Sequence, residues 1–291
     1  MKENPFTDGK LALVSKVACG GDLRQDISRA VTAVGGFERL VEAGDTILLK
    51  PNFNTADTPP GSSDPLFVKA IIELLYEHGA AKVLLGESSM LRLSTRETLR
   101  QTGMLREAEE AGADIVCFDE EGWVPVRTGG RYLKRVWFGK AGLEASKIVY
   151  VPCLKTHFLA DFTLSLKLTM GFVRPQDRIK MHLWRLREKL ADLNLIRAPD
   201  LIIMDGRRGF ISGGPQTGEL REPNLILASG DRIAMDVEGV RVIQGYPGHS
   251  LGKDAWSYPI IRRAVALGLG AGSEAAYRVV DAASSGQVDG Q

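Results

Sequence analysis

Two kinds of segment alternate along the chain. Short runs of consecutive apolar residues are typical of strands buried on both faces, and longer segments with apolar residues at every third or fourth position are typical of helices. We predict strands over residues 11–17, 46–50, 82–85, 114–118, 148–151, 199–204 and 224–228. We predict helices over residues 26–41, 65–78, 94–110, 177–197, 232–244 and 258–267. This order predicts an α/β fold with a mostly parallel sheet and helices on both faces.

One segment departs from this alternation. Residues 122–140 place Val, Arg, Tyr and Trp in alternation around Gly129 and Gly130, a pattern typical of an antiparallel hairpin. We therefore predict a β-hairpin insertion beside the main sheet. We also predict one domain over residues 1–280 and a disordered tail over residues 281–291, which are rich in Ser, Gly, Ala and Asp.

Polar and ionisable residues gather where the predicted strands end. Lys50 and Asn52 end one strand, and Asp205 follows another. Lys155 and His157 come shortly after a third strand. The carboxyl ends of parallel strands lie at one edge of the sheet, where ligands bind in open α/β folds. The sequence therefore predicts that these side chains converge on a ligand site at that edge.

The densest group of reactive side chains lies between residues 153 and 167. Lys155 and His157 point to the same face if the backbone between them is extended. Two cations resist coexisting where water is scarce, so the pKa of the lysine falls and the pair suits proton transfer or anion capture. The alternative is a solvated Lys155 beside a structural His157. Lys167 stands among apolar residues, so it must find a partner, reach a ligand or extend to solvent.

A metal site is a second hypothesis for the same region. Imidazole and carboxylate ligands suit Zn, Fe or Mn, and His157, Asp161 and His182 supply both types. Their spacing matches no zinc-protease motif, so the cofactor is left open, with a divalent metal as one candidate. The three cysteines are far apart and form no CxxC pair, so we expect no iron–sulfur cluster.

Composition narrows the classes of function. The chain has 37 Lys and Arg residues and 36 Asp and Glu residues, so its net charge is close to zero. Proteins that bind nucleic acid usually carry a clear excess of positive charge, and this composition therefore argues against nucleic acid as a general partner. The N-terminus lacks the apolar core of a signal peptide, and no apolar run is long enough to span a bilayer. We therefore expect a cytoplasmic protein without a membrane partner. The basic segment 177–197 keeps open the alternative of contact with RNA, a membrane or a partner protein.

Several short motifs in the chain resemble, in their order and spacing, the DUF362 family of unknown function. They are LLKPNFN (48–54), VPCLKTH (151–157), LSLKLTMGFV (164–173), RIKMH (178–182), Asp205 with Gly206, and ILASGDRIAMD (226–236). The residues that the family pattern singles out are Lys50, Lys155, His157, Lys167, His182 and Asp205. Many members carry an added ferredoxin-like segment rich in cysteine. This chain has no such segment, so the resemblance implies no cluster here.

The leading hypothesis from the sequence is an enzyme that acts on a small anionic metabolite. Lys155 and His157 would transfer protons, and Asp205 would orient a base or a metal. The residues expected to bind the anion are Lys50, Asn52, Lys167 and Arg178. The sequence leaves the substrate, the reaction and the oligomeric state open.

Overall fold

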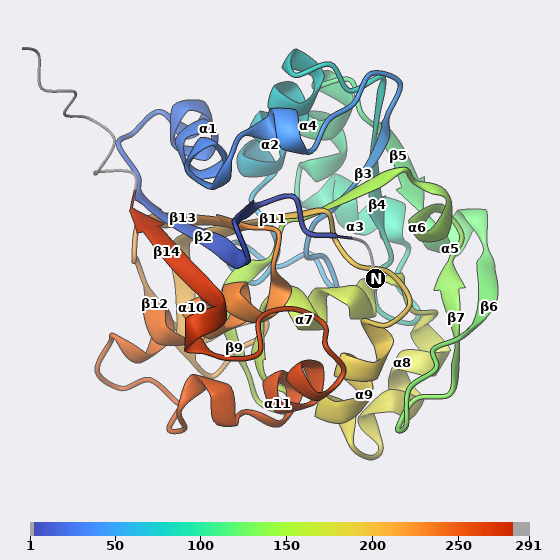
Figure 1. The fold of residues 1–291 in the computed structure, drawn as a ribbon. Helices are drawn as coiled ribbons and strands as arrows, with labels where there is room; N and C mark the ends of the chain where they lie inside the picture. Colours follow the sequence, from blue (N-terminus) through green and yellow to red (C-terminus); the bar gives the residue numbers. More distant parts are fainter. Residues whose placement is uncertain (1–2, 282–291) are drawn as a thin grey trace, which may run out of the picture.

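The computed structural model describes residues 3–281 of the chain (Figure 1). The centre of the described part is a large sheet, whose middle strands are parallel. In spatial order these are β11 (Leu201–Ser212), β8 (Lys147–Tyr150), β3 (Thr46–Lys50), β4 (Lys82–Glu87) and β5 (Asp114–Cys117). The predicted α/β fold with a mostly parallel sheet is confirmed.

The sheet continues beyond β11 with antiparallel strands. These are β13 (Leu225–Ser229), β2 (Leu11–Ala18) and β1 (Thr7–Asp8), and β14 (Tyr277–Asp281) lies parallel to β2. Three shorter strands extend β11 on its carboxyl side: β9 (Cys153–His157), β10 (Asp161–Thr163) and β12 (Glu219–Arg221). Of the predicted tail, Asp281 ends β14, and residues 282–291 lie outside the described residues.

Successive residues of the central strands enter two different hydrophobic cores. Leu48 packs in the core on one face, while Ile47 and Leu49 pack in the core on the other. Ile148 and Val149 of β8 divide in the same way. A strand that must be apolar on both faces reads as an unbroken apolar run, which is why these strands were recognisable.

Helices cover both faces of the sheet. One core takes its helical residues from α1 (Leu23–Val34), α2 (Pro65–Glu77), α3 (Thr95–Gln101) and α4 (Met104–Glu110). The other takes them from α7 (Ser165–Leu168), α8 (Pro175–His182), α9 (Leu186–Leu193), α10 (Arg232–Gln244) and α11 (Pro259–Ala266). Short helices α5 (Phe118–Glu121) and α6 (Ala141–Glu144) flank the insertion.

Four helices begin at a capping side chain. Asp22 caps α1, Ser94 caps α3 and Asp231 caps α10, each by accepting a hydrogen bond from backbone N–H groups of the first turn. Asp64 caps α2, with Pro65 at the first helical position, where a missing N–H costs nothing.

The predicted hairpin insertion is also confirmed. β6 (Trp123–Arg127) pairs antiparallel with β7 (Arg135–Gly139) and forms a two-stranded sheet of its own. The two strands lie at the right-hand edge in Figure 1, beyond α5 and α6.

Several predicted elements differ from the structure. The helix predicted over 26–41 ends at Val34, and the helix predicted over 94–110 is divided into α3 and α4 at Gly103. No strand was predicted over 153–157. Residues 153–157 are a strand, β9, because β10 pairs with them on one side and β11 on the other. The helix predicted over 177–197 is broken into α8 and α9, since Arg185 has a φ of 51° that no continuous helix can contain. The break separates the apolar stripe into an exposed half on α8 and a buried half on α9.

A buried carboxylate holds the segment between β10 and α8. Asp236 of α10 accepts hydrogen bonds from the backbone N–H of Ser165 (2.7 Å) and of Leu166 (3.1 Å), and also from the Ser165 hydroxyl. These are N–H groups of the first turn of α7, which has no other side-chain cap. Asp236 therefore fixes α7, and with it the position of Lys167.

We predict that Asp236→Ala destabilises the fold strongly, because each buried donor left without an acceptor costs roughly 1–3 kcal/mol. Urea unfolding followed by tryptophan fluorescence would measure the loss. The control is Asp114→Ala, whose carboxylate pairs with Lys82 at the surface. Equal stabilities of the two variants would contradict the role given to Asp236.

The same carboxyl group should make stability depend on pH. Burial raises the pKa of Asp236 from its ordinary value of 3.8 to about 7, so the folded state holds a proton that the unfolded state releases between these values. This stabilising contribution is complete below pH 3.8 and is lost as the pH rises through about 7. The stability of Asp236→Asn should lack this dependence.

Candidate functional site

A cavity of about 280 Å³ lies at the carboxyl edge of the parallel strands. Its wall includes the ends of β3, β4 and β9, the segment from α7 to α8, and the loop after β11. The predicted site residues that line it are Lys50, Asn52, Lys155, His157, Lys167, Arg178 and His182. The structure thus brings together seven of the nine residues that the sequence singled out, and we call this space the cationic cavity.

Lys50 is fully buried and ion-paired with Glu87, which follows from the parallel pairing of β3 with β4. The ammonium of Lys50 also donates to the carbonyl of Pro51 (2.7 Å), and Glu87 accepts from the backbone N–H of Phe53 (3.0 Å). Both charges are therefore satisfied within the protein. The pair forms part of the wall, and its lysine has little capacity left for an anion.

Gly171 allows the backbone to approach this pair. A Cβ atom at Gly171 would lie 2.5 Å from both Cε and Nζ of Lys50 and 3.2 Å from Oε2 of Glu87. The side chains of Lys50 and Glu87 cannot move away from such a Cβ atom, because they are buried and bonded to each other. Only glycine fits at this position.

Lys155 is buried and holds two neighbouring loops. Its ammonium donates to the side-chain oxygen of Asn52 (3.3 Å) and to the carbonyl of Gly61. Burial lowers the pKa of Lys155. Its charge has no carboxylate partner within bonding distance in residues 3–281, so this cation contributes positive potential to the cavity.

Among the Lys and Arg side chains that line the cavity, Lys167 is the one without a hydrogen-bond or ion-pair partner in residues 3–281. It projects from α7 into the cationic cavity, and no hydrogen bond or ion pair to its Nζ is found across residues 3–281. Burial, followed by the nearby charges of Lys155 and Arg178, lowers the pKa of Lys167 to about 7. The amine is therefore poised to hold or release a proton at neutral pH.

Arg178 brings a third cation to the cavity and anchors α8. Its guanidinium donates to the carbonyls of Val173 (2.6 Å), Gly171 (3.1 Å) and Ser89 (3.3 Å). Burial lowers the pKa of Arg178 to about 10, so the group stays charged at neutral pH. Carbonyl oxygens satisfy its N–H groups without neutralising its charge.

The tautomer of His157 follows from its contacts. Its Nδ1 lies 3.0 Å from the backbone N of Leu159 and 3.2 Å from that of Ala160, and both N–H groups are donors. Nδ1 must therefore accept, and the ring proton sits on Nε2. Burial, followed by the charge of Lys167, lowers the pKa of His157 to about 2, so the ring is neutral. His157 is a hydrogen-bond donor through Nε2.

His182 has the opposite tautomer. Its Nδ1 lies 2.7 Å from the carbonyl oxygen of Arg178, which can only accept, so the ring proton sits on Nδ1. The Nε2 lone pair is then available as a base. Partial burial and the charge of Lys167 lower the pKa of His182. The side chain is exposed at the mouth of the cavity.

The structure does not join His157, Asp161 and His182 as metal ligands. Asp161 forms a two-point ion pair with Arg187, with its Oδ1 2.9 Å from Nη2, and does not line the cavity. Nδ1 of each histidine is already bonded to the backbone. Across residues 3–281, no group of three or more His, Cys, Asp or Glu side chains is arranged to hold a metal ion.

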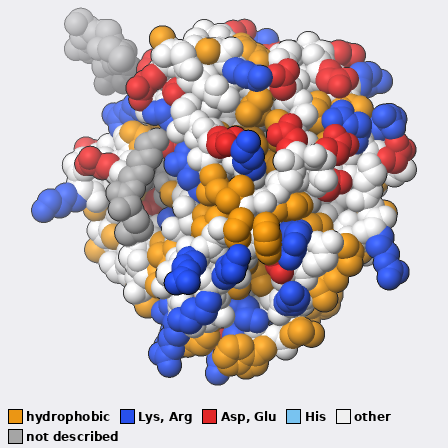
Figure 2. All heavy atoms as spheres, turned by 90° about the vertical axis from the view of Figure 1, so that its right-hand side faces the viewer, with side chains coloured by type: hydrophobic (Ala, Val, Ile, Leu, Met, Phe, Trp, Pro, Cys, Tyr) orange, Lys and Arg blue, Asp and Glu red, His pale blue; other side chains and the backbone are white. Residues whose placement is uncertain are grey.

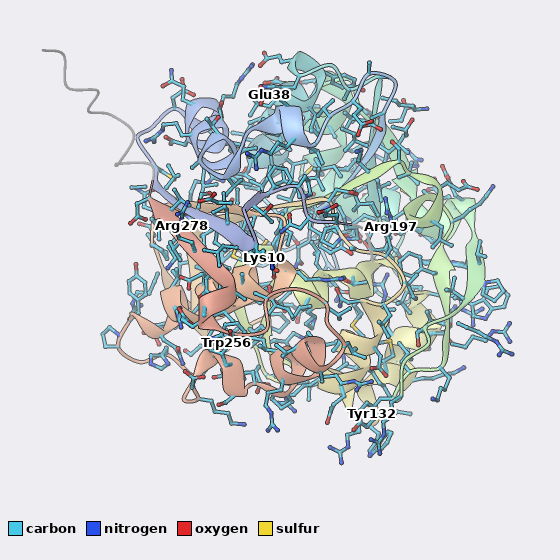
Figure 3. All side chains as sticks on the ribbon, viewed as in Figure 1. Lys10, Glu38, Tyr132, Arg197, Trp256 and Arg278 are labelled. Carbon is cyan, nitrogen blue, oxygen red and sulfur yellow. The ribbon has the colours of Figure 1, made fainter. Side chains whose placement is uncertain are left out.

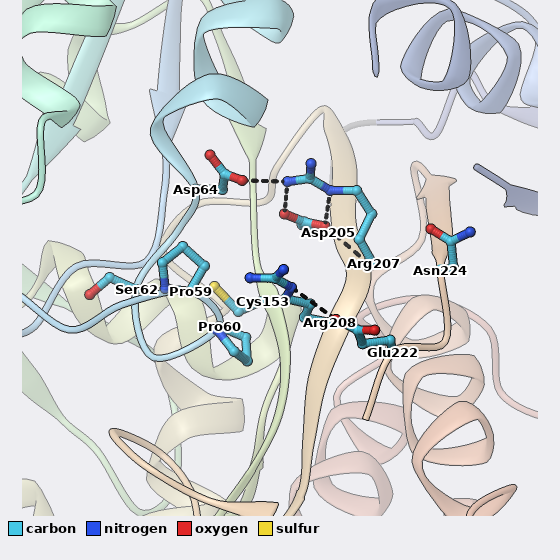
Figure 4. A pocket seen from close by; sticks show the side chains of 10 residues that line it. All are labelled: Pro59, Pro60, Ser62, Asp64, Cys153, Asp205, Arg207, Arg208, Glu222 and Asn224. Atoms are coloured by element: carbon cyan, nitrogen blue, oxygen red, sulfur yellow. Dashed lines mark hydrogen bonds and ion pairs between the residues drawn. The ribbon is translucent and has the colours of Figure 1, made fainter. Parts of the chain in front are cut away.

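Asp205 lies in a different cavity of about 520 Å³, shown in Figure 4. Its carboxylate is bonded to Arg207, with Oδ2 2.7 Å from Nη2 and Oδ1 2.9 Å from Nε, and Arg207 also reaches Asp64 (2.8 Å). Cys153 lines this second cavity too, and burial raises the pKa of its thiol. Asp205 is therefore not brought to the residues that it was expected to orient.

The sequence places Glu87 at the carboxyl end of a predicted strand, but its pairing with Lys50 depends on strand register. Two residues that shape the site, Gly171 and Asp236, were missed at the level of sequence. Gly171 follows Lys167 closely, and a glycine inside an apolar segment signals a close approach. Asp236 is 70 residues from Leu166, so no local pattern links them.

We predict that Gly171→Ala lowers the free energy of unfolding by roughly 1–3 kcal/mol, because the added methyl group would overpack the buried space beside Lys50. Urea unfolding would measure this. The control is Gly252→Ala, because a Cβ at Gly252 would meet no atom within 4 Å. If Gly171→Ala were as stable as the control, the side chains of Lys50 and Glu87 would have to be able to move away from the added methyl group, which would contradict this account.

No described helix is long and apolar enough to cross a membrane.

Among relatives, a thylakoid-associated protein of Synechocystis sp. is 28% identical over 238 residues, which are 77% of this chain and 71% of that protein.

Two solved structures align with part of the chain. The lactate racemase apoprotein from Thermoanaerobacterium thermosaccharolyticum aligns with 81% of this chain and 58% of its own at 13% identity, with a TM-score of 0.47. A protein from Thermotoga maritima aligns with 77% of this chain and 56% of its own at 11% identity, with a TM-score of 0.45. This chain therefore covers little more than half the length of either structure.

The profile of a domain of unknown function, DUF362, matches residues 47–241, which include every residue assigned above to the cationic cavity. The motif resemblance is thereby confirmed, and the chain belongs to the DUF362 family.

Proposed function

We propose that this protein is an enzyme that binds a small anionic metabolite in the cationic cavity and transfers a proton at it. The observation that carries the proposal is the amine of Lys167, which faces the cavity without a partner in the described structure and has a pKa of about 7. General acid/base catalysis needs a group whose pKa lies near the working pH.

The charges around the cavity support an anion as the ligand. Lys155, Lys167 and Arg178 face it, whereas the carboxylate of Glu87 is already matched by Lys50. Asp57, whose carboxylate accepts from Thr55, is the other acidic residue of the described wall. An entering anion would gain charge-assisted hydrogen bonds and would relieve repulsion among the cations.

The rest of the lining supports a ligand with an apolar part. Phe53, Leu91, Met170 and Ile179 contribute apolar surface to the same cavity. A pocket that is mainly apolar with a few placed polar groups is typical of small-molecule sites. We infer that the ligand is a small carboxylate with an apolar, for example aliphatic, part.

The tautomers of the two histidines suggest a division of roles. His157 would donate from Nε2 to an oxygen on which negative charge develops. Proton transfer, which the sequence assigned to Lys155 and His157, would belong to Lys167 and to the free Nε2 of His182. In such a step the proton leaves the substrate for the amine, the bonding electrons stay on the substrate, and the ammonium returns the proton.

Native mass spectrometry of freshly purified protein would test whether a small anion copurifies. We expect a bound anion in the wild type and its loss in Lys167→Met. The matched control is Lys10→Met, because Lys10 is an exposed lysine outside the cavity (Figure 3). Retention of the anion in Lys167→Met, or its loss in both variants, would contradict the proposal.

A titration with butyrate provides a pH test. The ammonium form of Lys167 attracts the carboxylate more strongly than the neutral amine does. The affinity should therefore be highest below pH 7, where butyrate is still ionised, and should fall by up to about tenfold per pH unit above pH 7. Lys167→Met should bind weakly and without this dependence. An unchanged pH profile in the variant would mean that another group controls binding.

A further inference from the structure

Five large apolar side chains near the mouth of the cationic cavity are exposed to solvent. Phe158 (74% exposed) and Leu159 belong to the turn between β9 and β10. Ile179, Leu183 (79%) and Trp184 (60%) belong to the end of α8 and its connection to α9. We call these five residues the apolar rim. Exposed clusters of this kind on a soluble surface mark interaction sites.

The break between α8 and α9 keeps half of the rim exposed. A continuous helix would have carried Leu183 along the same stripe as Leu186 and Leu190, which are buried. The left-handed conformation of Arg185 (φ 51°) interrupts that stripe, so Leu183 and Trp184 point into solvent. A non-glycine residue in this conformation is strained, and the fold maintains it at a point where the result is exposed apolar surface.

The two segments of the rim are held next to each other. The Asp161–Arg187 ion pair joins the strand after the β9–β10 turn to α9. His157, which stacks on Phe158, and Ile179 line the same cavity. Trp184 lies beside Tyr132, with ring centroids 6.2 Å apart, and Tyr132 is labelled at the lower end of the molecule in Figure 3.

Cations surround the rim. Residues 178–189 contain five Lys and Arg side chains, of which Arg178 is buried in the cavity. Arg187 is paired with Asp161, Arg185 with Glu188 (2.9 Å) and Lys180 more loosely with Asp177 (3.7 Å). Lys180 and Arg185 are exposed, and Lys189 lies over the ring of Trp184 with its Nζ 5.7 Å from the centroid. Figure 2 shows hydrophobic side chains together with Lys and Arg side chains at the lower end of that face, where α8 and α9 lie.

We propose that the apolar rim and its cations form a docking surface for an anionic lipid membrane. Basic residues near such a surface are attracted by about 1 kcal/mol each, and Trp side chains favour the headgroup region. Leu183, Trp184 and Phe158 would enter that region, while Lys180 and Arg185 would contact lipid phosphates. Extended RNA is a poorer match, since aliphatic Leu183 and Ile179 offer bases no flat surface for stacking.

This proposal differs from the expectation drawn from the sequence, which gave the chain no membrane partner. The local surface, and not the net charge of +1, would decide membrane contact. The docking surface can be tested independently of the proposed enzyme activity, because Lys180, Leu183 and Trp184, the residues substituted in its test, do not line the cationic cavity.

Cosedimentation with lipid vesicles would test the docking surface. We expect binding to vesicles of phosphatidylcholine and phosphatidylglycerol (7:3), little binding to pure phosphatidylcholine, and release by high salt. The double variant Leu183→Ser with Trp184→Ser should bind at least about tenfold more weakly, and Lys180→Glu should weaken binding less. The control is Leu66→Ser, which removes an exposed leucine from α2.

Other outcomes would overturn the proposal. These are no binding of the wild type to anionic vesicles at low salt, or equal binding by the double variant and the Leu66→Ser control. Retention of single-stranded RNA in place of vesicles, with the same loss in the double variant, would assign the surface to nucleic acid. A dimer of the wild type that the double variant lacks, without vesicle binding, would assign it to a second copy of the chain.

Discussion

The cationic cavity concentrates positive charge in a place where water is scarce. Lys155, Lys167 and Arg178 face one small space, and the nearest buried carboxylate, Glu87, is already paired with Lys50. Like charges in a poorly solvated site raise one another's free energy, so either a proton must leave or an anion must enter. Burial lowers the pKa of both lysines. Lys167 has no hydrogen-bond partner in residues 3–281, whereas Lys155 is held by two oxygen acceptors and Arg178 by three carbonyls.

The surrounding fold holds this arrangement from several directions. The register of β3 on β4 places Lys50 against Glu87, and Gly171 leaves room for the pair. Asp236 of α10, which packs in the same core as α7, bonds to the first turn of α7 and so fixes the position of Lys167. The unfavourable grouping of cations is therefore supported by packing and hydrogen bonds in the rest of the domain, a pattern typical of sites that bind or react.

The sequence predicted the parts of this account that depend on local or repeating patterns. Apolar runs marked the central strands, and the rule for parallel sheets brought Lys50 near Lys155. Predictions that needed tertiary information failed. Asp205 was expected at the site, but its carboxylate turns to Arg207 in a second cavity.

The break between α8 and α9 is a second feature that could not be predicted from the local sequence. Residues 183–185 contain neither glycine nor proline, so nothing in the local sequence signals the left-handed turn at Arg185. The turn exists because α9 must face the core with Leu186 and Leu190 while α8 covers the cavity with Arg178. The tautomers of His157 and His182 likewise depend on backbone groups that only the folded chain brings into reach.

The most direct test of this account is the pKa of the Lys167 amine in the unliganded protein. It can be measured from the pH dependence of the chemical shift of a 13C-labelled lysine side chain, with Lys167→Arg identifying the resonance. The account predicts a value near 7. A value close to the ordinary 10.5 would mean that solvent or a counter-charge reaches the amine, and the proposed role of the cavity would be wrong.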